Sequence, residues 1–454
     1  MEFEMVGSGR GRRLRIRGEL PRGFHGEQQG DCWLCPLDAV NATALRRELP
    51  WTAPRPLGLG KSIGCGDRLG LATPGHVRAV RKGDMAGVFA QQSIREMERC
   101  SRSAQDVIDD AAWGVLLMDY REGYGSDADH VKQITDIDAC IEAGFTGFTL
   151  DPNEHVDYAA QDDDAAVLQA KFESLAPDDL EATPDDLRRL YLAGAAASPL
   201  DEETLLRASG KYSRAIIHVK NLARHIEGRF GSDPFDLEVS VDETDTPTSP
   251  AEHWFIASEL QRHSVRVDGL APRFIGDFEK GVDYIGDLQR FEDDFAAHAR
   301  IAREMGPYKL SIHTGSDKFR IYPIIHRHAG ELVHLKTAGT SWLEALRVIA
   351  LRDAAFFREI LALARERFET DRATYHISGR LERVPVDPPD DELPTLFEQF
   401  DARQALHVTF GSQLDRFRDR LYAFLHAHED DYQAVLETHF DRHIAPFPSA
   451  TGRD

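Results

Sequence analysis

The chain has 454 residues, of which 42% are hydrophobic, and its formal net charge at pH 7 is −23. This length predicts one large domain with additions or two to three smaller domains, and the apolar fraction is sufficient for a sizeable core. The negative charge argues against a nucleic-acid partner, and the lack of an apolar run of about 18 residues argues against a membrane helix.

The cysteines and the N-terminus predict a cytoplasmic protein. Five cysteines are an odd number and too few for a disulfide scaffold, which indicates a reducing compartment. Cys32 and Cys35 form a C-x-x-C pair, but no βαβ context or second pair accompanies them, so we interpret them as ordinary small residues. The basic segment Met1 to Arg17 has no apolar stretch, and we expect no signal peptide.

Short apolar runs that end in polar residues recur along the chain after residue 60. The eight runs are 61–72, 87–93, 112–120, 144–151, 235–244, 272–278, 308–314 and 332–339. Helical patterns lie between most of them, and this alternation indicates parallel strands joined through helices. Eight such units predict a (β/α)8 TIM barrel. A doubly wound sheet is the alternative, but no G-x-G-x-x-G or Walker loop follows any of the runs.

Three further segments flank or interrupt the predicted barrel, which spans residues 61–385. Residues 1–60 are rich in Gly, Arg and Pro and predict an N-terminal extension or small subdomain. The acidic, helical stretch at about 152–234 is too long for a simple crossover and predicts a helical insertion or lid. A Pro-Pro-Asp-Asp break precedes amphipathic helices, so residues 386–454 are expected to form a C-terminal helical cap.

Polar side chains gather at the predicted strand ends, where a TIM barrel carries its active site. Strand alternation places them in groups on one face: Lys309, Ser311 and His313; His334 and Lys336; Asp277 and Glu279. Unpaired buried charge costs several kcal/mol, so a barrel interior of this kind points to function. The alternative is that these charges only pair with one another as structure.

Histidines and carboxylates from separate strands indicate a divalent metal ion, of the kind Mn²⁺, Zn²⁺, Co²⁺ or Ni²⁺. The first choice of ligands is His130, Glu279 and His313, with Asp277 and His334 as alternates. Asp129 directly precedes His130, which predicts an acid/base group beside a ligand. His76 follows the first predicted strand and is a weaker candidate for contact with the substrate.

Several of these stretches resemble a known family, the bacterial tagaturonate/fructuronate epimerases of hexuronate catabolism. The stretches that carry the resemblance are 66–76, 89–97, 127–132, 144–152, 239–245, 272–281, 311–319, 334–340 and 406–411. The similarity runs from about residue 60 to about residue 447. It implies an isomerase that interconverts tagaturonate and fructuronate, with a small ketohexuronate as substrate and a homo-oligomer as one expected state.

A more distant resemblance links Asp129-His130 and His313-Thr-Gly-Ser to the strand ends of class II metal-dependent aldolases. That family usually holds a divalent ion with three histidines, and its middle histidine falls near Glu279 here. Either Glu279 replaces this histidine or His334 supplies the third ligand. Two other functions therefore stay open: a metal-dependent aldolase that releases its fragments, and a sugar-acid-binding barrel without catalysis.

The chemistry of the implied reaction predicts a mechanism. The inverted carbinol is β to the ketone, so enolisation does not invert it, whereas cleavage and re-formation of the carbon–carbon bond does. Such a retro-aldol route needs two acid/base groups, and we assign Asp129 and Glu243 to these roles. Lys336 and Lys309 are candidates for holding the substrate carboxylate. Ser311, Asp277 and His334 are also expected to bind the substrate.

Overall fold

The computed structural model describes residues 2–194 and 198–449. Its centre is a closed barrel of eight parallel strands, in which each strand pairs with its neighbours along the chain and β12 closes on β5. The strands are β5 (Ser62–Cys65), β6 (Ala86–Ser93), β7 (Gly125–Val131), β8 (Gly147–Leu150), β9 (Asp236–Val241), β10 (Gly269–Pro272), β11 (Lys309–Ile312) and β12 (Val333–Thr337). The predicted (β/α)8 fold is confirmed.

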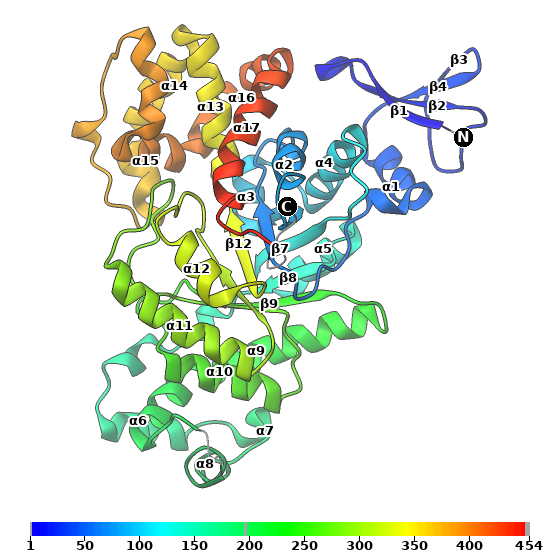
Figure 1. Cartoon of the computed structure of the whole chain (residues 1–454). Helices are drawn as coiled ribbons and strands as arrows, with labels where there is room; N and C mark the ends of the chain where they lie inside the picture. The colour runs from blue at the N-terminus through cyan, green and yellow to red at the C-terminus, as the bar shows by residue number, and fades with distance from the viewer. Residues whose placement is uncertain (1, 195–197, 450–454) are drawn as a thin grey trace.

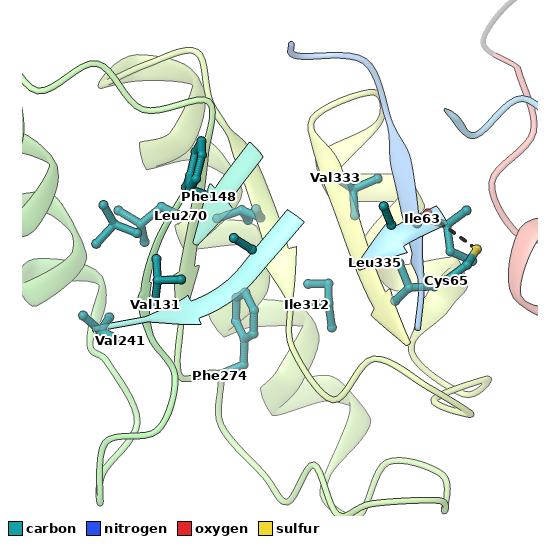
Figure 2. Close-up of a cluster of buried hydrophobic side chains, with 14 of the residues drawn as sticks. Ile63, Cys65, Val131, Phe148, Val241, Leu270, Phe274, Ile312, Val333 and Leu335 are labelled. Atoms are coloured by element: carbon teal, nitrogen blue, oxygen red, sulfur yellow. Dashed lines mark hydrogen bonds between the residues drawn. The ribbon is translucent and has the colours of Figure 1, made fainter. Parts of the chain in front are cut away.

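Alternation along the strands separates an apolar face from a polar one. In β12, Val333 and Leu335 pack into the hydrophobic cluster around the barrel, together with Ile63 and Ile312 of the neighbouring strands (Figure 2). Because successive strand residues point to opposite faces, Lys336 points into the barrel instead. The interior therefore carries the polar side chains, and the helices outside cover the apolar ones.

The third strand lies elsewhere than the sequence predicted. The run 112–120 falls largely in helix α4 (Ala104–Leu117), whose buried residues include Ile108, Ala112 and Val115. A short apolar run does not distinguish a buried helix from a buried strand. The actual strand, β7, reads GSDADHV and is poor in apolar residues, because two of its carboxylates face the barrel interior. The sixth run was also displaced, since β10 reaches only its first residue, Pro272.

Helices surround the barrel and extend it at two places. Those between the strands are α2 (Thr73–Val80), α3 (Ile94–Cys100), α4, α5 (Ile134–Ala143), α10 (Pro250–Arg262), α11 (Leu288–Glu304) and α12 (Tyr322–Ala329). The insertion between β8 and β9 contains α6 (Ala165–Glu173), α7 (Pro177–Leu180), α8 (Pro184–Arg188), a π-helical turn (Arg189–Gly194) and α9 (Glu202–Phe230). The sequence of this stretch predicts separate helices at 183–197, 202–208 and 214–228. Residues 195–197 of the first lie outside the described residues, and the other two are one helix, α9.

The C-terminal helices return to the barrel after β12. They are α13 (Thr340–Arg352), α14 (Ala354–Asp371), α15 (Phe400–Val408), α16 (Phe410–Ala427) and α17 (Glu429–Ile444), with the 3-10 turns Arg372–Thr374, Leu381–Arg383 and Asp390–Glu398 between them. Helix α17 packs against α2, so the last helix of the chain lies beside the start of the barrel. Figure 1 shows these helices at the opposite end of the molecule from α6, α7 and α8.

The N-terminal segment forms a small antiparallel sheet beside the barrel (Figure 1). Its strands are β1 (Glu2–Val6), β2 (Arg13–Arg17), β3 (Glu27–Gln29) and β4 (Cys32–Cys35), and helix α1 (Ala39–Glu48) follows. Cys32 and Cys35 are the ends of β4, and both thiols are free. None of the described helices is long and apolar enough to cross a membrane.

Candidate active site

A single buried lysine organises the centre of the barrel. Lys336 of β12 is 4% exposed, and its Nζ lies 2.8 Å from Asp127, 2.7 Å from Asp129 and 3.0 Å from Glu238. The ammonium also donates to Thr149 Oγ1 at 2.6 Å. Burial alone would lower the pKa of Lys336, but the three carboxylates raise it well above the ordinary value. Lys336, expected to bind substrate, is therefore occupied by the chain's own carboxylates.

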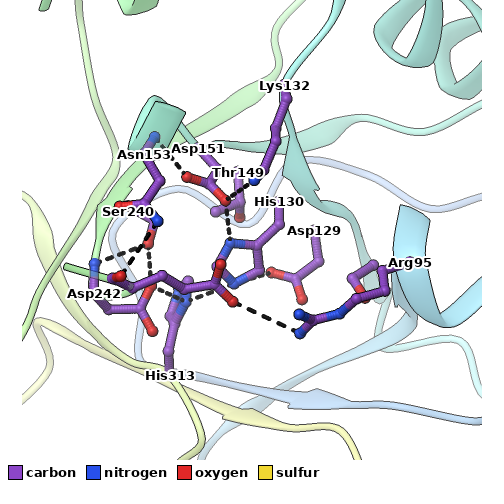
Figure 3. A network of polar contacts seen from close by, with 12 residues as sticks. Arg95, Asp129, His130, Lys132, Thr149, Asp151, Asn153, Ser240, Asp242 and His313 are labelled. Carbon is purple, nitrogen blue, oxygen red and sulfur yellow. Dashed lines mark hydrogen bonds and ion pairs between the residues drawn. The ribbon is translucent and has the colours of Figure 1, made fainter. Parts of the chain in front are cut away.

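Two histidines meet at the carboxyl ends of β7 and β11. His130 Nε2 lies 3.1 Å from His313 Nδ1, and His313 Nδ1 lies 3.1 Å from Asp242 Oδ1 (Figure 3). The second ring nitrogen of each histidine contacts a buried carboxylate. His130 Nδ1 lies 3.1 Å from Asp151 Oδ2, and His313 Nε2 lies 2.6 Å from Glu238 Oε1. Each imidazole is thus held in one orientation, with one nitrogen turned toward the centre of the site.

The surrounding charges shift the pKa values of these groups. Burial would lower the pKa of His130, but Asp129 and Asp151 raise it to about 10. Burial would also lower the pKa of His313, but Asp242 raises it to about 8. The carboxyl of Asp129 shows the reverse, because Lys336 outweighs burial and lowers its pKa well below the ordinary range. Asp129 is therefore an ionised carboxylate in this arrangement.

The backbone at this edge of the barrel adopts unusual conformations. His130 has a φ of +53° and Thr314, next to His313, has a φ of +49°. Residues with a side chain rarely occupy this region, and for a β-branched residue such as threonine it is strained. Strain of this kind persists where the surrounding structure holds it, and it is concentrated at functional sites.

A cavity of about 490 Å³ opens above the histidines, and a smaller hollow of about 50 Å³ leads from it toward the barrel centre. Both are lined by Arg95, Asp242, Glu243, Lys280, His313, Thr314 and Tyr375. The inner hollow adds Asp129, His130 and Lys336. The outer cavity adds Thr374 and His376, so the C-terminal segment supplies one wall. No described residue of the insertion after β8 lines either space.

Asp129, His130, His313 and Glu243, which the sequence singled out, all line this site. Three of them, Asp129, His130 and His313, carry ligand atoms within 4.8 Å of one another, and His130, Asp151 and Glu243 form a second such group. Glu243 is exposed, and its carboxylate lies 3.6 Å from the guanidinium of Arg95.

Glu279 does not join His130 and His313 in this structure. Its Oε2 accepts hydrogen bonds from the backbone N–H and hydroxyl of Ser378 and from Gln404 Nε2, at 2.9, 2.9 and 2.8 Å. The expected ligand therefore ties the loop after β10 to the C-terminal segment. The reason lies in the loop: strand alternation does not extend past Pro272, where β10 ends.

The remaining predicted residues lie apart from the two histidines. Asp277 lines the outer cavity, where its carboxylate is 3.5 Å from His376. His334 contacts Ser62 at 2.9 Å, and burial lowers its pKa to about 3. Lys309 donates to the same hydroxyl at 3.2 Å, deep in the barrel. Ser311 is fully buried, and its hydroxyl has no hydrogen-bond partner in the part of the chain that the structure describes.

Three other histidines, His76, His439 and His443, do not line the cavity. His76 contacts Ser341 Oγ at 2.8 Å and is fully buried, so it does not reach the cavity. Asp317, His439 and His443 also lie close enough to hold a metal. Their atoms are already used, however, because Arg403 donates to Asp317 at 2.8 Å and His443 Nε2 accepts from the Asp317 N–H at 3.0 Å. This group fastens α17 to the loop after β11.

Sequence reasoning assigned no role to several residues of the site: Asp127, Asp151, Glu238, Asp242, Lys280 and Tyr375. Alternation in β9 could have found two of them, because Glu238 and Asp242 share a strand face with Ser240. Asp151 stands at the end of β8 in the same way. Tyr375 had no such signal, since only the folded C-terminal segment brings it to the barrel.

An eight-stranded parallel barrel with ionisable side chains at the carboxyl ends of its strands has the architecture of a (β/α)8-barrel enzyme. A family model described as tagaturonate epimerase (UxaE) matches residues 16–447. The chain therefore belongs to the tagaturonate epimerase family, which is a family of isomerases.

Individual relatives agree with this assignment. The chain is 41% identical over 460 residues to the tagaturonate/fructuronate epimerase of Thermotoga maritima, covering 98% of this chain and 94% of the relative. It is 37% identical to the native crystal structure of fructuronate-tagaturonate epimerase UxaE from Cohnella laeviribosi, with a TM-score of 0.91 over 98% of this chain and 93% of that one. A glycerol complex of the same Cohnella enzyme gives a TM-score of 0.90.

Lys336 offers a test of the charge arrangement. Replacing it with methionine leaves three buried carboxylates without their cation, and we expect the free energy of unfolding to fall by about 3–5 kcal/mol. Urea unfolding followed by circular dichroism measures the change. The control is Lys82→Met, which removes a half-exposed lysine paired with Glu437 and Asp441, and should destabilise the protein far less because exposed ion pairs contribute little. Equal losses in the two variants would contradict the central role of Lys336.

Proposed function

We propose that this chain interconverts tagaturonate and fructuronate with the help of a divalent metal ion bound by His130 and His313. One observation carries the metal assignment: each histidine gives one ring nitrogen to a buried carboxylate and turns the other toward the same point. Metal-binding histidines are held in this manner, because the carboxylate fixes the ring and makes it a better ligand.

The carboxylates around that point suit a cation. Asp242 lies 3.1 Å from His313 Nδ1, and Asp129 lies 3.9 Å from His130 Nε2. Nitrogen and carboxylate ligands together favour ions such as Zn²⁺, Mn²⁺, Co²⁺ or Ni²⁺. When bound, the ion would stabilise the negative charge that develops on substrate oxygens as a Lewis acid.

The residues around the histidines suit inversion through carbon–carbon cleavage. A base removes the proton from the hydroxyl β to the ketone, the bond between the α and β carbons breaks, and its electrons remain on the ketone fragment as an enediolate. The β carbon becomes an aldehyde, turns over, and accepts the same bond on its other face. Asp129 is held ionised by Lys336 and acts as one proton acceptor, and Glu243 beside Arg95 serves the other face.

The direct test is to incubate the purified protein with tagaturonate and follow the carbohydrate signals by NMR. We expect fructuronate to appear, the activity to disappear after chelation, and a divalent ion to restore it. Accumulation of two three-carbon fragments in place of fructuronate would instead indicate an aldolase. Unchanged tagaturonate with the metal-loaded protein would contradict the proposal.

A pair of variants tests which carboxylate completes the metal site. Asp242→Asn replaces the carboxylate next to His313 with a neutral amide and should lower the metal affinity at least about 10-fold. Glu279→Gln should leave the metal affinity within about 3-fold, because Glu279 bonds to Ser378 and Gln404 instead. Equilibrium dialysis with metal analysis measures both. The opposite ranking would return Glu279 to the metal site.

A further inference from the structure

Three cationic side chains line the cavity, and none of them is an acid or base in the proposed proton transfers. Arg95, Arg273 and Lys280 line its outer part, and Arg95 and Lys280 also line the inner hollow beside His130 and His313. Of the three, only Arg95 forms an ion pair with a described residue. Arg95 faces the carboxylate of Glu243 at 3.6 Å, and Arg273 donates to the backbone carbonyl of Thr244.

Like Arg273, Lys280 forms no ion pair with a described residue, but of these two cations only Lys280 also lines the inner hollow. The only described hydrogen bond of its ammonium goes to the hydroxyl of Thr314, at 2.9 Å. The carboxylates of Glu96, Glu243 and Asp242 act on it only at longer range. A partly buried ammonium without a close counter-ion is costly, and a bound anion would remove that cost.

The loop that carries Lys280 is fastened on both sides. Before it, the carboxylate of Glu279 holds Ser378, and the Glu279 carbonyl accepts from Lys318 Nζ at 2.9 Å. After it, the carbonyl of Gly281 accepts from Arg403 Nε at 2.5 Å. Beneath it, the strained backbone of Thr314 keeps the threonine hydroxyl against the ammonium. The position of Lys280 is thus fixed by contacts that do not use its charge.

We propose that Lys280 binds the carboxylate of the ketohexuronate substrate and keeps the acid fragment in place while its aldehyde turns over. The inference rests on the proposed function, which supplies the sugar acid. It gives the expected carboxylate-binding role to Lys280 in place of Lys336, whose ammonium already contacts three carboxylates. Glu279 then has a role in positioning the loop of Lys280.

The chemistry of the cleavage explains why this anchor is useful. When the bond between the α and β carbons breaks, the β carbon leaves as the aldehyde of a three-carbon acid, and its carboxylate is two bonds away. Rotation about the bond between the aldehyde and the neighbouring carbinol presents the other face, without moving the carboxylate. An anchored carboxylate therefore allows inversion and opposes escape of the fragment. No atoms are gained or lost, because the proton and the carbon–carbon bond both return.

The test compares Lys280→Met and Lys280→Arg with the unchanged protein on two substrates. Tagaturonate carries the carboxylate, and the neutral ketose tagatose has a hydroxymethyl group in its place. We expect Lys280→Met to lower kcat/KM for tagaturonate about 100-fold and for tagatose less than about 3-fold. Lys280→Arg should recover part of the loss, because it keeps the charge. Escape of the three-carbon aldehyde acid, trapped as its oxime and measured by mass spectrometry, should rise per turnover in Lys280→Met.

Two control variants locate the effect. Arg95→Met removes a cation that Glu243 already neutralises, and Lys82→Met removes a half-exposed lysine outside the cavity. Neither should lower the preference for the acid over the ketose as Lys280→Met does. The assignment would be overturned if Lys280→Met lowered kcat/KM equally for both substrates, or if it left kcat/KM for tagaturonate unchanged. A loss specific to tagaturonate that appears only in Arg95→Met would also overturn it.

Binding separates this inference from the proposed function. If the unchanged protein binds tagaturonate in calorimetry without converting it, the proposed function fails, and the affinities still test Lys280. A loss of affinity for the acid in Lys280→Met, with tagatose binding unchanged, supports the carboxylate contact. Equal affinities of the two proteins for the acid contradict it.

Discussion

Replacement of His313 with alanine is expected to lower tagaturonate turnover on the order of 10³-fold or more. His313 is the residue that contacts His130, Asp242 and Glu238 at once, so its loss removes one of the two proposed metal ligands and separates the groups around it. The loss of Lewis-acid stabilisation amounts to several kcal/mol, and each 1.4 kcal/mol corresponds to a factor of ten in rate. Metal analysis of the purified variant should show that the bound ion is gone.

His334→Ala is the matched control for this variant. His334 is another buried histidine of the barrel, but it contacts Ser62 and lies apart from His130. Its removal should leave the metal content intact. Metal retained in His313→Ala and lost in His334→Ala would show that the ligand assignment is wrong.

Asp129→Asn is expected to reduce turnover by about 10²–10⁴-fold while metal and substrate remain bound. The asparagine keeps the shape of the side chain and a hydrogen bond acceptor for Lys336, but it does not accept the substrate proton. Stopped assays give kcat, and calorimetry gives substrate affinity.

Asp127→Asn neutralises a second carboxylate that contacts Lys336, at 2.8 Å, but Asp127 does not line the inner hollow. This variant should lose far less activity than Asp129→Asn. Equal losses would mean that the charge around Lys336 matters and the acid/base role of Asp129 does not.

The fold was predictable because its signal is repeated. Eight units of strand and helix identify a barrel even when individual strands are misplaced, as happened most clearly at 112–120. That error has a physical origin, because the residues that make β7 functional are polar. Strand β7 contains Asp127, Asp129 and His130, and its apolar signal is therefore weaker than that of the helix before it.

The site was predictable where a strand determines the direction of a side chain. His130 and His313 lie at strand ends, and the structure brings them together. Glu279 lies beyond the end of β10, and its direction depends on Ser378 and Gln404, about a hundred residues further along the chain. The role of Lys336 was also hidden, because alternation shows that a lysine points inward but not which carboxylates meet it.

Conversion of tagaturonate in D₂O, followed by NMR over the first turnovers, tests the central claim most directly. In a route that breaks the carbon–carbon bond, the hydrogen on the inverted carbon never leaves that carbon. We predict fructuronate with no deuterium at the inverted position. Deuterium at that carbon in the first product formed would contradict the account, because it would require removal of the carbon-bound proton and a different role for Asp129 and Glu243.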